Sequence, residues 1–199
     1  MKFFIVGKHC AGKLECLNLV EEMGVRVGRE FSNIQSNSPN IYIDPEYEKY
    51  SLEDVDRLFE QNSFIYMHGV EESGVLDGYS LYRGLSHYTY DNADVMIIPP
   101  QALARINKKI ITDHVVFVWM DAARDHRIHR FVEEDRKYSF VEIEKNESRY
   151  DLDFMKNICS LKNYSLLYFN NEDPGRVATI IAAIHKHPDL LPLFADNYN

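Results

Sequence analysis

The sequence predicts a three-layer α/β domain in which helices flank a parallel sheet of about five strands. Short apolar runs of strand length alternate along the chain with helix-like segments, which is the pattern of such a sheet. The first run is followed by a glycine-flanked loop and then by a helical pattern. The length of 199 residues suits one domain with a small inserted subdomain, and the hydrophobic content of 45% is ample for a packed core.

The N-terminal segment carries the strongest motif. Residues 3–6 form an apolar strand-like run, residues 7–13 read GKHCAGK and match G-x-x-x-x-G-K, and a helical pattern begins at Leu14. The glycines permit a tight loop whose amide groups point inward. The helix adds the positive end of its dipole, and Lys13 can reach the terminal phosphates. The motif predicts a nucleotide-phosphate site, for which a strand–helix turn with accidental glycines is the alternative.

The predicted phosphate ligands are the loop residues and the residue that follows them. They are Gly7, Lys8, His9, Cys10, Ala11, Gly12, Lys13 and Leu14. Leu14 departs from the motif, because a Ser or Thr hydroxyl at this place ligates magnesium. The motif therefore predicts a nucleotide-phosphate site with magnesium (Mg²⁺), in which one expected metal ligand is replaced by an aliphatic side chain.

Local patterns predict the elements after the loop. Apolar residues at helical spacing indicate a helix over 14–23, which Gly24 ends. Residues 25–50 are polar and include a stretch rich in Ser, Asn and Pro, so we expect an irregular excursion with one or two small strands, one of them at 40–43. The hydroxyl of Ser51 can cap a further helix.

The rest of the chain returns to the core pattern. Apolar and β-branched runs predict strands, and amphipathic or charged segments between them predict helices. Strands are expected at 64–67, 94–98, 114–120 and 165–169. Helices are expected at 85–92, 101–106, 122 to about 137, 152–158 and 177–185, the last with Pro174 near its first turn.

Charge and cysteine content limit the class of partner. The net charge of −9 argues against a nucleic-acid partner, which normally needs a basic face, whereas a small nucleotide needs only local cations. The cysteines Cys10, Cys16 and Cys159 form neither a paired framework nor a metal-binding spacing, which indicates a reducing compartment. No signal peptide or membrane-spanning run occurs, so we expect a soluble, cytoplasmic protein, with its oligomeric state left open.

Arginines gather in the charged helix that follows the strand at 114–120. Arg124, Arg127 and Arg130 are three residues apart and therefore form one cationic stripe. The stripe follows the carboxyl end of a core strand, where ligands bind in open α/β sheets, and it can close over a transferring phosphoryl group. A solvated face paired with the acidic residues at 133–135 is the alternative.

Asp121 ends the same apolar strand and is the candidate metal ligand. A hydrophobic strand closed by a carboxylate resembles a Walker-B segment, and such a carboxylate can hold magnesium through water. Capping of the following helix is an equal alternative. Asp91 and Asp94 are weaker candidates for the metal.

The order of these features resembles guanylate kinase and its relatives among the P-loop nucleoside monophosphate kinases. The resemblance covers most of the chain, through short motifs in the same order. REFSN at 29–33 lies where that family has its mobile monophosphate-binding subdomain, YSLYRG at 79–84 is similar to its segment beside the acceptor phosphate, and YFNNED at 168–173 is similar to its turn near the donor adenine. The resemblance implies a core at 1–24 and 85–190, a monophosphate-binding insertion at 25–84 and a lid-like region at 122–150.

The resemblance also implies substrate residues, with a purely structural role as the alternative for each. The implied acceptor ligands are Arg29 and Arg83 for the monophosphate, Tyr79 and Tyr82 as hydrogen-bonding partners, and Tyr42 or Phe31 for the base. Asn171 and Asp173 are implied beside the adenine. The guanine-site signature of the family is not matched by residues 29–40, so guanine specificity is not carried over.

Together these observations predict an ATP- and magnesium-dependent kinase that converts a nucleoside or deoxynucleoside 5′-monophosphate to its diphosphate. The catalytic cations would be Lys13, Arg124, Arg127 and Arg130. Two alternatives keep the fold: a kinase acting on a hydroxyl of a modified base in DNA, and a non-catalytic binding module. Bacteriophages also encode small kinases of this type, and the compact, divergent motifs fit such an origin.

Overall fold

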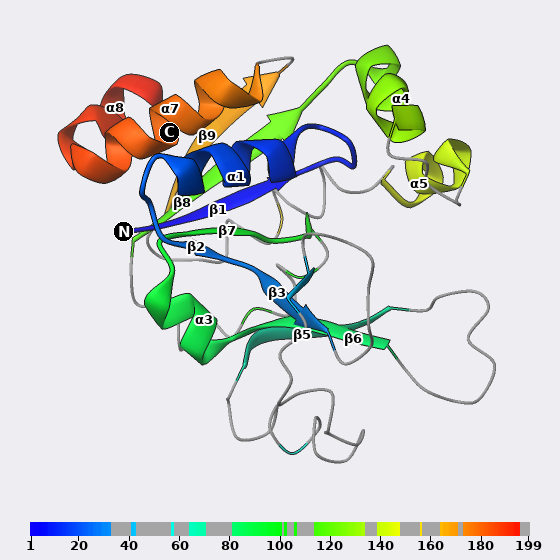
Figure 1. The fold of residues 1–199 in the computed structure, drawn as a ribbon, viewed down its shortest axis with the longest axis horizontal. Helices are drawn as coiled ribbons and strands as arrows, with labels where there is room; N and C mark the ends of the chain where they lie inside the picture. Colours follow the sequence, from blue (N-terminus) through cyan, green and yellow to red (C-terminus); the bar gives the residue numbers. More distant parts are fainter. Residues whose placement is uncertain are drawn as a thin grey trace.

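The computed structural model contains a central sheet of five parallel strands. It describes residues 1–32, 41–42, 57, 64–70, 81–100, 102, 106, 114–133, 139–147, 156, 164–170 and 173–195. The strands of the sheet are β1 (Lys2–Gly7), β2 (Val27–Gly28), β7 (Val95–Ile97), β8 (Val115–Asp121) and β9 (Tyr164–Asn170). They lie in the order β2-β7-β1-β8-β9, with every neighbouring pair parallel (Figure 1). The predicted α/β class and its sheet of about five parallel strands are confirmed.

Two helices cover one face of this sheet. They are α1 (Lys13–Glu22) and α7 (Pro174–Lys186), which lie together on the same side in Figure 1. Phe3 of β1 is fully buried in one cluster with Leu17 of α1 and Ile181 of α7. Because successive strand residues point to opposite faces, Phe4 faces the other side of the sheet. Burial on both faces explains why β1 reads as a continuous apolar run.

A second, four-stranded sheet and one helix cover the opposite face. The strands β3 (Glu30–Ser32), β4 (Ile41–Tyr42), β5 (Phe64–Val70) and β6 (Leu81–Ser86) lie in the order β4-β3-β6-β5, and α3 (His87–Asn92) follows β6. Phe4, Tyr66 and Leu85 share one buried cluster, which joins the two sheets. The region predicted as an insertion thus contributes most of this second sheet, while its short strand β2 belongs to the central sheet.

The remaining described helices lie near the carboxyl ends of the central strands or at the end of the chain. Helices α4 (Arg124–Glu133) and α5 (Phe140–Glu147) lie on the same side of the molecule as the loop after β1 (Figure 1). The 3-10 helix η3 (Pro188–Leu190) and helix α8 (Leu191–Phe194) follow α7. Among helices in the described ranges, none has both the length and the apolar character needed to cross a bilayer.

The prediction of a helix over 85–92 is wrong at its start. Leu85 and Ser86 are the last residues of β6, and α3 begins at His87. The Ser86 hydroxyl caps the helix by accepting a hydrogen bond from the Thr89 amide at 3.1 Å. Leu85 is fully buried in the cluster between the two sheets, and this long-range contact cannot be inferred from local periodicity.

Other boundaries also differ by one to three residues from the prediction. The first helix begins at Lys13, the charged helix begins at Arg124, and β5 extends to Val70. The helices predicted after Ser51, over 101–106 and over 152–158 lie largely outside the described residues.

An ion pair joins the residue before β7 to the segment before β2. Arg26 donates through Nε and NH2 to the two carboxylate oxygens of Asp94, each at 2.8 Å, and His185 lies 3.4 Å from the same carboxylate. Burial raises the pKa of Asp94, but the Arg26 hydrogen bonds and the charges of Arg26, His185 and Lys2 outweigh burial and hold the pKa below its usual value.

We expect Asp94→Asn to destabilise the protein at neutral pH and to have less effect in acid. A carboxyl group with a depressed pKa stabilises the fold above its unfolded pKa of about 3.9, and this contribution is lost as pH falls through the folded value. Urea unfolding at neutral pH and below about pH 4 measures the difference. Asp189→Asn, at an exposed position of η3, is the matched control. A free-energy difference that does not change with pH would contradict this expectation.

Candidate phosphate-binding site

The loop between β1 and α1 has a backbone that only small residues can adopt at two points. Gly7 has φ +144° and Gly12 has φ +87°. A Cβ atom at Gly7 would lie 1.9 Å from the Met120 carbonyl oxygen, because β1 and β8 are paired at these two residues. Cys10 also has a positive φ of 58°, which is uncommon for a residue with a side chain. The glycines of the motif are therefore required by the geometry of this loop.

Helix α1 presents its N-terminus to this loop. Its N-cap is Gly12, and within the described residues no side chain caps the amide groups of the first turn. These amide groups and the positive end of the helix dipole are the features with which helices bind phosphate. The local sequence therefore places an anion-binding helix end next to the loop backbone.

The side chain of Lys13 folds back over the loop. Its ammonium group donates to the Gly7 carbonyl oxygen at 2.9 Å and to the Lys8 carbonyl oxygen. This position holds the charge against the first residues of the loop, and in the predicted role the ammonium group contacts the terminal phosphates.

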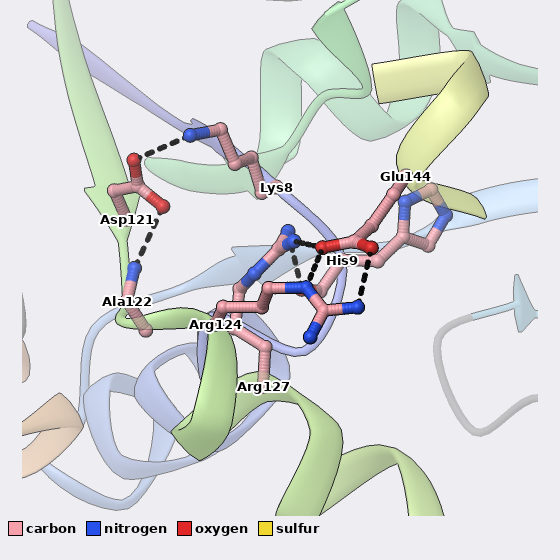
Figure 2. Close-up of polar contacts among 7 residues, drawn as sticks. All are labelled: Lys8, His9, Asp121, Ala122, Arg124, Arg127 and Glu144. Atoms are coloured by element: carbon pink, nitrogen blue, oxygen red, sulfur yellow. Dashed lines mark hydrogen bonds and ion pairs between the residues drawn. The ribbon is translucent and has the colours of Figure 1, made fainter. Parts of the chain in front are cut away.

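Helix α4 brings two arginines to the loop. Arg127 NH1 lies 3.5 Å from the His9 carbonyl oxygen, and Arg130 NH1 donates to the Cys10 carbonyl oxygen at 3.3 Å (Figure 2 shows Arg127 and His9). The guanidinium of Arg130 also borders Gly12, since a Cβ there would lie 3.1 Å from Arg130 NH1. Two of the three predicted arginines thus contact the predicted loop.

Arg124, the third arginine of the stripe, is paired with helix α5. Arg124 Nε and NH2 donate to Glu144 Oε1 and Oε2 at 2.7 and 2.9 Å. Arg127 NH2 lies 3.6 Å from Glu144 Oε1, so one carboxylate serves both arginines (Figure 2). Among the described contacts, the three arginines bind loop carbonyl oxygens and Glu144. The alternative, a solvated stripe paired with the acidic residues at 133–135, involves side chains that lie outside the described part of the chain.

Asp121 lies at the carboxyl end of β8, beside the loop. Lys8 Nζ donates to Asp121 Oδ2 at 2.7 Å, and the Ala122 amide donates to Asp121 Oδ1 at 2.8 Å (Figure 2). Helix α4 begins only at Arg124, so Asp121 is not its N-cap. The weaker candidates Asp91 and Asp94 lie before β7, at the opposite edge of the sheet.

The side chains of this site offer magnesium few oxygen ligands. Asp121 is a carboxylate in the expected place, whereas the Leu14 side chain has no oxygen atom. Among the described residues, no group of three or more His, Cys, Asp or Glu side chains has the arrangement of a metal site. Magnesium commonly keeps several waters and binds one or two carboxylates together with substrate phosphates, and the residues here fit that mode of binding.

The residues predicted for the acceptor are placed only in part. Arg29 pairs with Glu21 of α1 at 2.6 Å, through a contact that also lowers the pKa of Glu21. Tyr42 lies on β4, and Tyr82 and Arg83 lie on β6 of the four-stranded sheet. Phe31 of β3 is buried and stacks on Phe64, with ring centroids 4.8 Å apart. Tyr79 is outside the described residues.

Of the two residues predicted beside the adenine, only one lies in the described part of the chain. Asp173 is the N-cap of α7, where its carboxylate accepts a hydrogen bond from the Arg176 amide at 3.1 Å. Asn171 lies outside the described residues. The described contact of Asp173 is therefore a structural one.

Sequence reasoning missed two parts of this site. Glu144 is 20 residues from Arg124 in the chain, and no local spacing indicates that they pair. Lys8 was predicted as one of the phosphate ligands of the loop, and its ion pair with the Asp121 carboxylate was not foreseen. A search for acidic residues on the segment after the arginine helix would have found Glu144 among several candidates.

Together β1, the glycine loop, α1 and the parallel sheet form an α/β fold that is consistent with the fold of P-loop kinases. The structure is similar to the crystal structure of guanylate kinase from Anaplasma phagocytophilum, with a TM-score of 0.52 and 13% sequence identity over 100% of this chain and 90% of that chain. A sugar kinase from a Janibacter species aligns over 98% of both chains with 11% identity and a TM-score of only 0.39. No family model matches the sequence, and no curated protein matches it. The similarity to guanylate kinase concerns the fold.

Proposed function

We propose that this protein is an ATP-dependent phosphotransferase whose acceptor is a nucleoside or deoxynucleoside 5′-monophosphate. The observation that carries the proposal is the convergence of three cations on one glycine loop. Lys13 lies over the loop carbonyls, and Arg127 and Arg130 reach the loop from α4. Phosphoryl transfer requires aligned donor and acceptor groups, cations on the equatorial oxygens and exclusion of water, and little covalent chemistry from the protein.

Each part of the site has a role in this proposal. The loop amides and Lys13 would hold the β- and γ-phosphates of ATP, and Arg127 and Arg130 would neutralise charge that develops on the transferring group. Magnesium would be held by phosphate oxygens, water and Asp121, and it would neutralise charge on the phosphates.

The acceptor is proposed on the side of the four-stranded sheet. Arg29 lies just before β3, and Tyr82 and Arg83 lie on the neighbouring strand β6, which pairs with β3 in antiparallel register. A guanidinium group can bind a monophosphate with two parallel hydrogen bonds. The likeness to guanylate kinase supports an acceptor of this kind without indicating which base is accepted.

A non-catalytic nucleotide-binding module is the second candidate. Leu14 favours it, because the magnesium-ligating hydroxyl of the motif is absent at this position. The pairing of Asp121 with Lys8 at 2.7 Å favours it as well, since magnesium would have to compete with an ammonium group. A kinase acting on DNA is disfavoured by the net charge of −9.

The test is to incubate the protein with ATP, magnesium and each ribo- and deoxyribonucleoside monophosphate in turn, and to separate the products. We expect a diphosphate to form from one or a few of these acceptors. ATP binding in a calorimetric titration without any diphosphate product would favour the binding module. Absence of ATP binding at millimolar concentration would contradict both candidates.

A further inference from the structure

We propose that Glu144 sets the phosphate affinity of this site, because it is an internal anion that competes with phosphate for Arg124 and Arg127. The proposal deepens the proposed function and rests on the binding of nucleotide phosphates at the glycine loop. It assigns a role in affinity to a residue of α5 that belongs neither to the loop nor to the arginine stripe.

The first support is the geometry of the carboxylate. Glu144 accepts two near-parallel hydrogen bonds from Arg124, at 2.7 and 2.9 Å, which is the fork arrangement that guanidinium groups also form with phosphate. Its Oε1 atom lies 3.6 Å from Arg127 NH2. Figure 2 shows the carboxylate between the two guanidinium groups. A phosphate that used the same donors would have to replace Glu144.

The second support is the burial of Arg127. Its side chain is 5% exposed, whereas that of Glu144 is 27% exposed. A buried cation depends strongly on its anionic partner, because little water is present to replace that partner. The energy of the pair therefore opposes any phosphate that draws Arg127 away from Glu144, and the carboxylate repels an incoming phosphate as well.

The third support is that α5 has an apolar anchor that does not depend on the charge of Glu144. The Phe140 ring packs edge-on against Phe131 of α4, with centroids 5.4 Å apart, and both belong to a buried cluster with Cys10 of the loop. The guanidinium carbons of Arg124 and Arg127 lie 5.7 and 5.3 Å from the centroid of the Phe140 ring. Removal of the carboxylate charge should therefore leave α5 packed against α4.

The test compares Glu144→Gln with the wild type in calorimetric titrations against two probes, inorganic tripolyphosphate and ATP. Glutamine keeps the shape of the side chain and removes its negative charge. We expect both probes to bind roughly fivefold more tightly to the variant, a factor at the lower end of couplings between sites, with a smaller gain at high salt. Glu22→Gln, at an exposed position near the end of α1, removes the same charge away from the loop and should leave both affinities unchanged.

Every outcome decides the proposal. Unchanged or weaker binding in Glu144→Gln would overturn the proposal. It would indicate that Glu144 only holds the arginine side chains in position. Glu144→Asp keeps the charge but shortens its reach by one methylene, so a smaller gain is expected from it, and it takes the place of the glutamine variant if that variant does not fold. If the wild type and both variants bind neither probe, the proposed function fails and this inference fails with it. If ATP binds equally to all of them, only this inference fails.

Discussion

Replacement of Lys13 by alanine is expected to lower turnover at least about 100-fold, a loss comparable to the removal of one donor that stabilises transition-state charge. The physical reason is the position of the ammonium group, which lies against the Gly7 and Lys8 carbonyl oxygens at the start of the loop. From there it can contact the terminal phosphates in both the ground state and the transition state. The measurement is kcat and KM for diphosphate formation with the preferred acceptor.

The fold must remain intact for this result to be informative. Lys13 also ties the two ends of the loop together, so alanine removes a structural contact as well as a charge. Lys13→Met retains most of the aliphatic stem, and thermal unfolding of both variants separates loss of stability from loss of charge. Lys186→Ala, at an exposed position in the last turn of α7, is the matched control and should retain full activity. Undiminished activity in a folded Lys13→Met protein would contradict the assignment of the loop.

The elements predicted correctly are those whose signal is local. The apolar run of β1 is buried on both faces, and its sequence alone shows this. Gly7 and Gly12 mark the loop because their backbone conformations exclude most other residues. The spacing of three residues places Arg127 and Arg130 on one side of α4, and both side chains contact the same loop.

The features missed by sequence analysis depend on contacts between distant segments. Leu85 belongs to the end of β6, where it is buried between the two sheets, although the helix α3 begins only two residues later. Arg124 and Arg127 look equivalent in the sequence, yet the packing of α5 makes the first the main partner of Glu144 and leaves the second in contact with the loop. Periodicity predicts which residues share a face of a helix, but the docking of that face depends on tertiary packing.

The substitution Gly7→Ala is expected to destabilise the protein by about 3 kcal/mol or more, in the range reached only by severe steric or backbone changes. Its Cβ atom would lie 1.9 Å from the Met120 carbonyl oxygen and 2.9 Å from the carbonyl carbon, both of which are backbone atoms of the adjacent strand. No side-chain rotation can relieve this overlap. Relief requires β1 and β8 to separate where they are paired, or the φ of +144° to change and the loop with it. Urea unfolding measures the loss.

Gly24→Ala separates the steric part of this effect from the backbone part. Gly24 also has a positive φ, of +84°, but no heavy atom lies within 4 Å of the Cβ that alanine would add. Its substitution should lower the free energy of unfolding by about 1 to 2 kcal/mol, because alanine disfavours the left-handed backbone conformation. Gly7→Ala must therefore be clearly the less stable of the two. Equal stabilities would mean that β1 and β8 can move apart at little cost, and the loop would then lack the rigid strand support that phosphate binding at its amides requires.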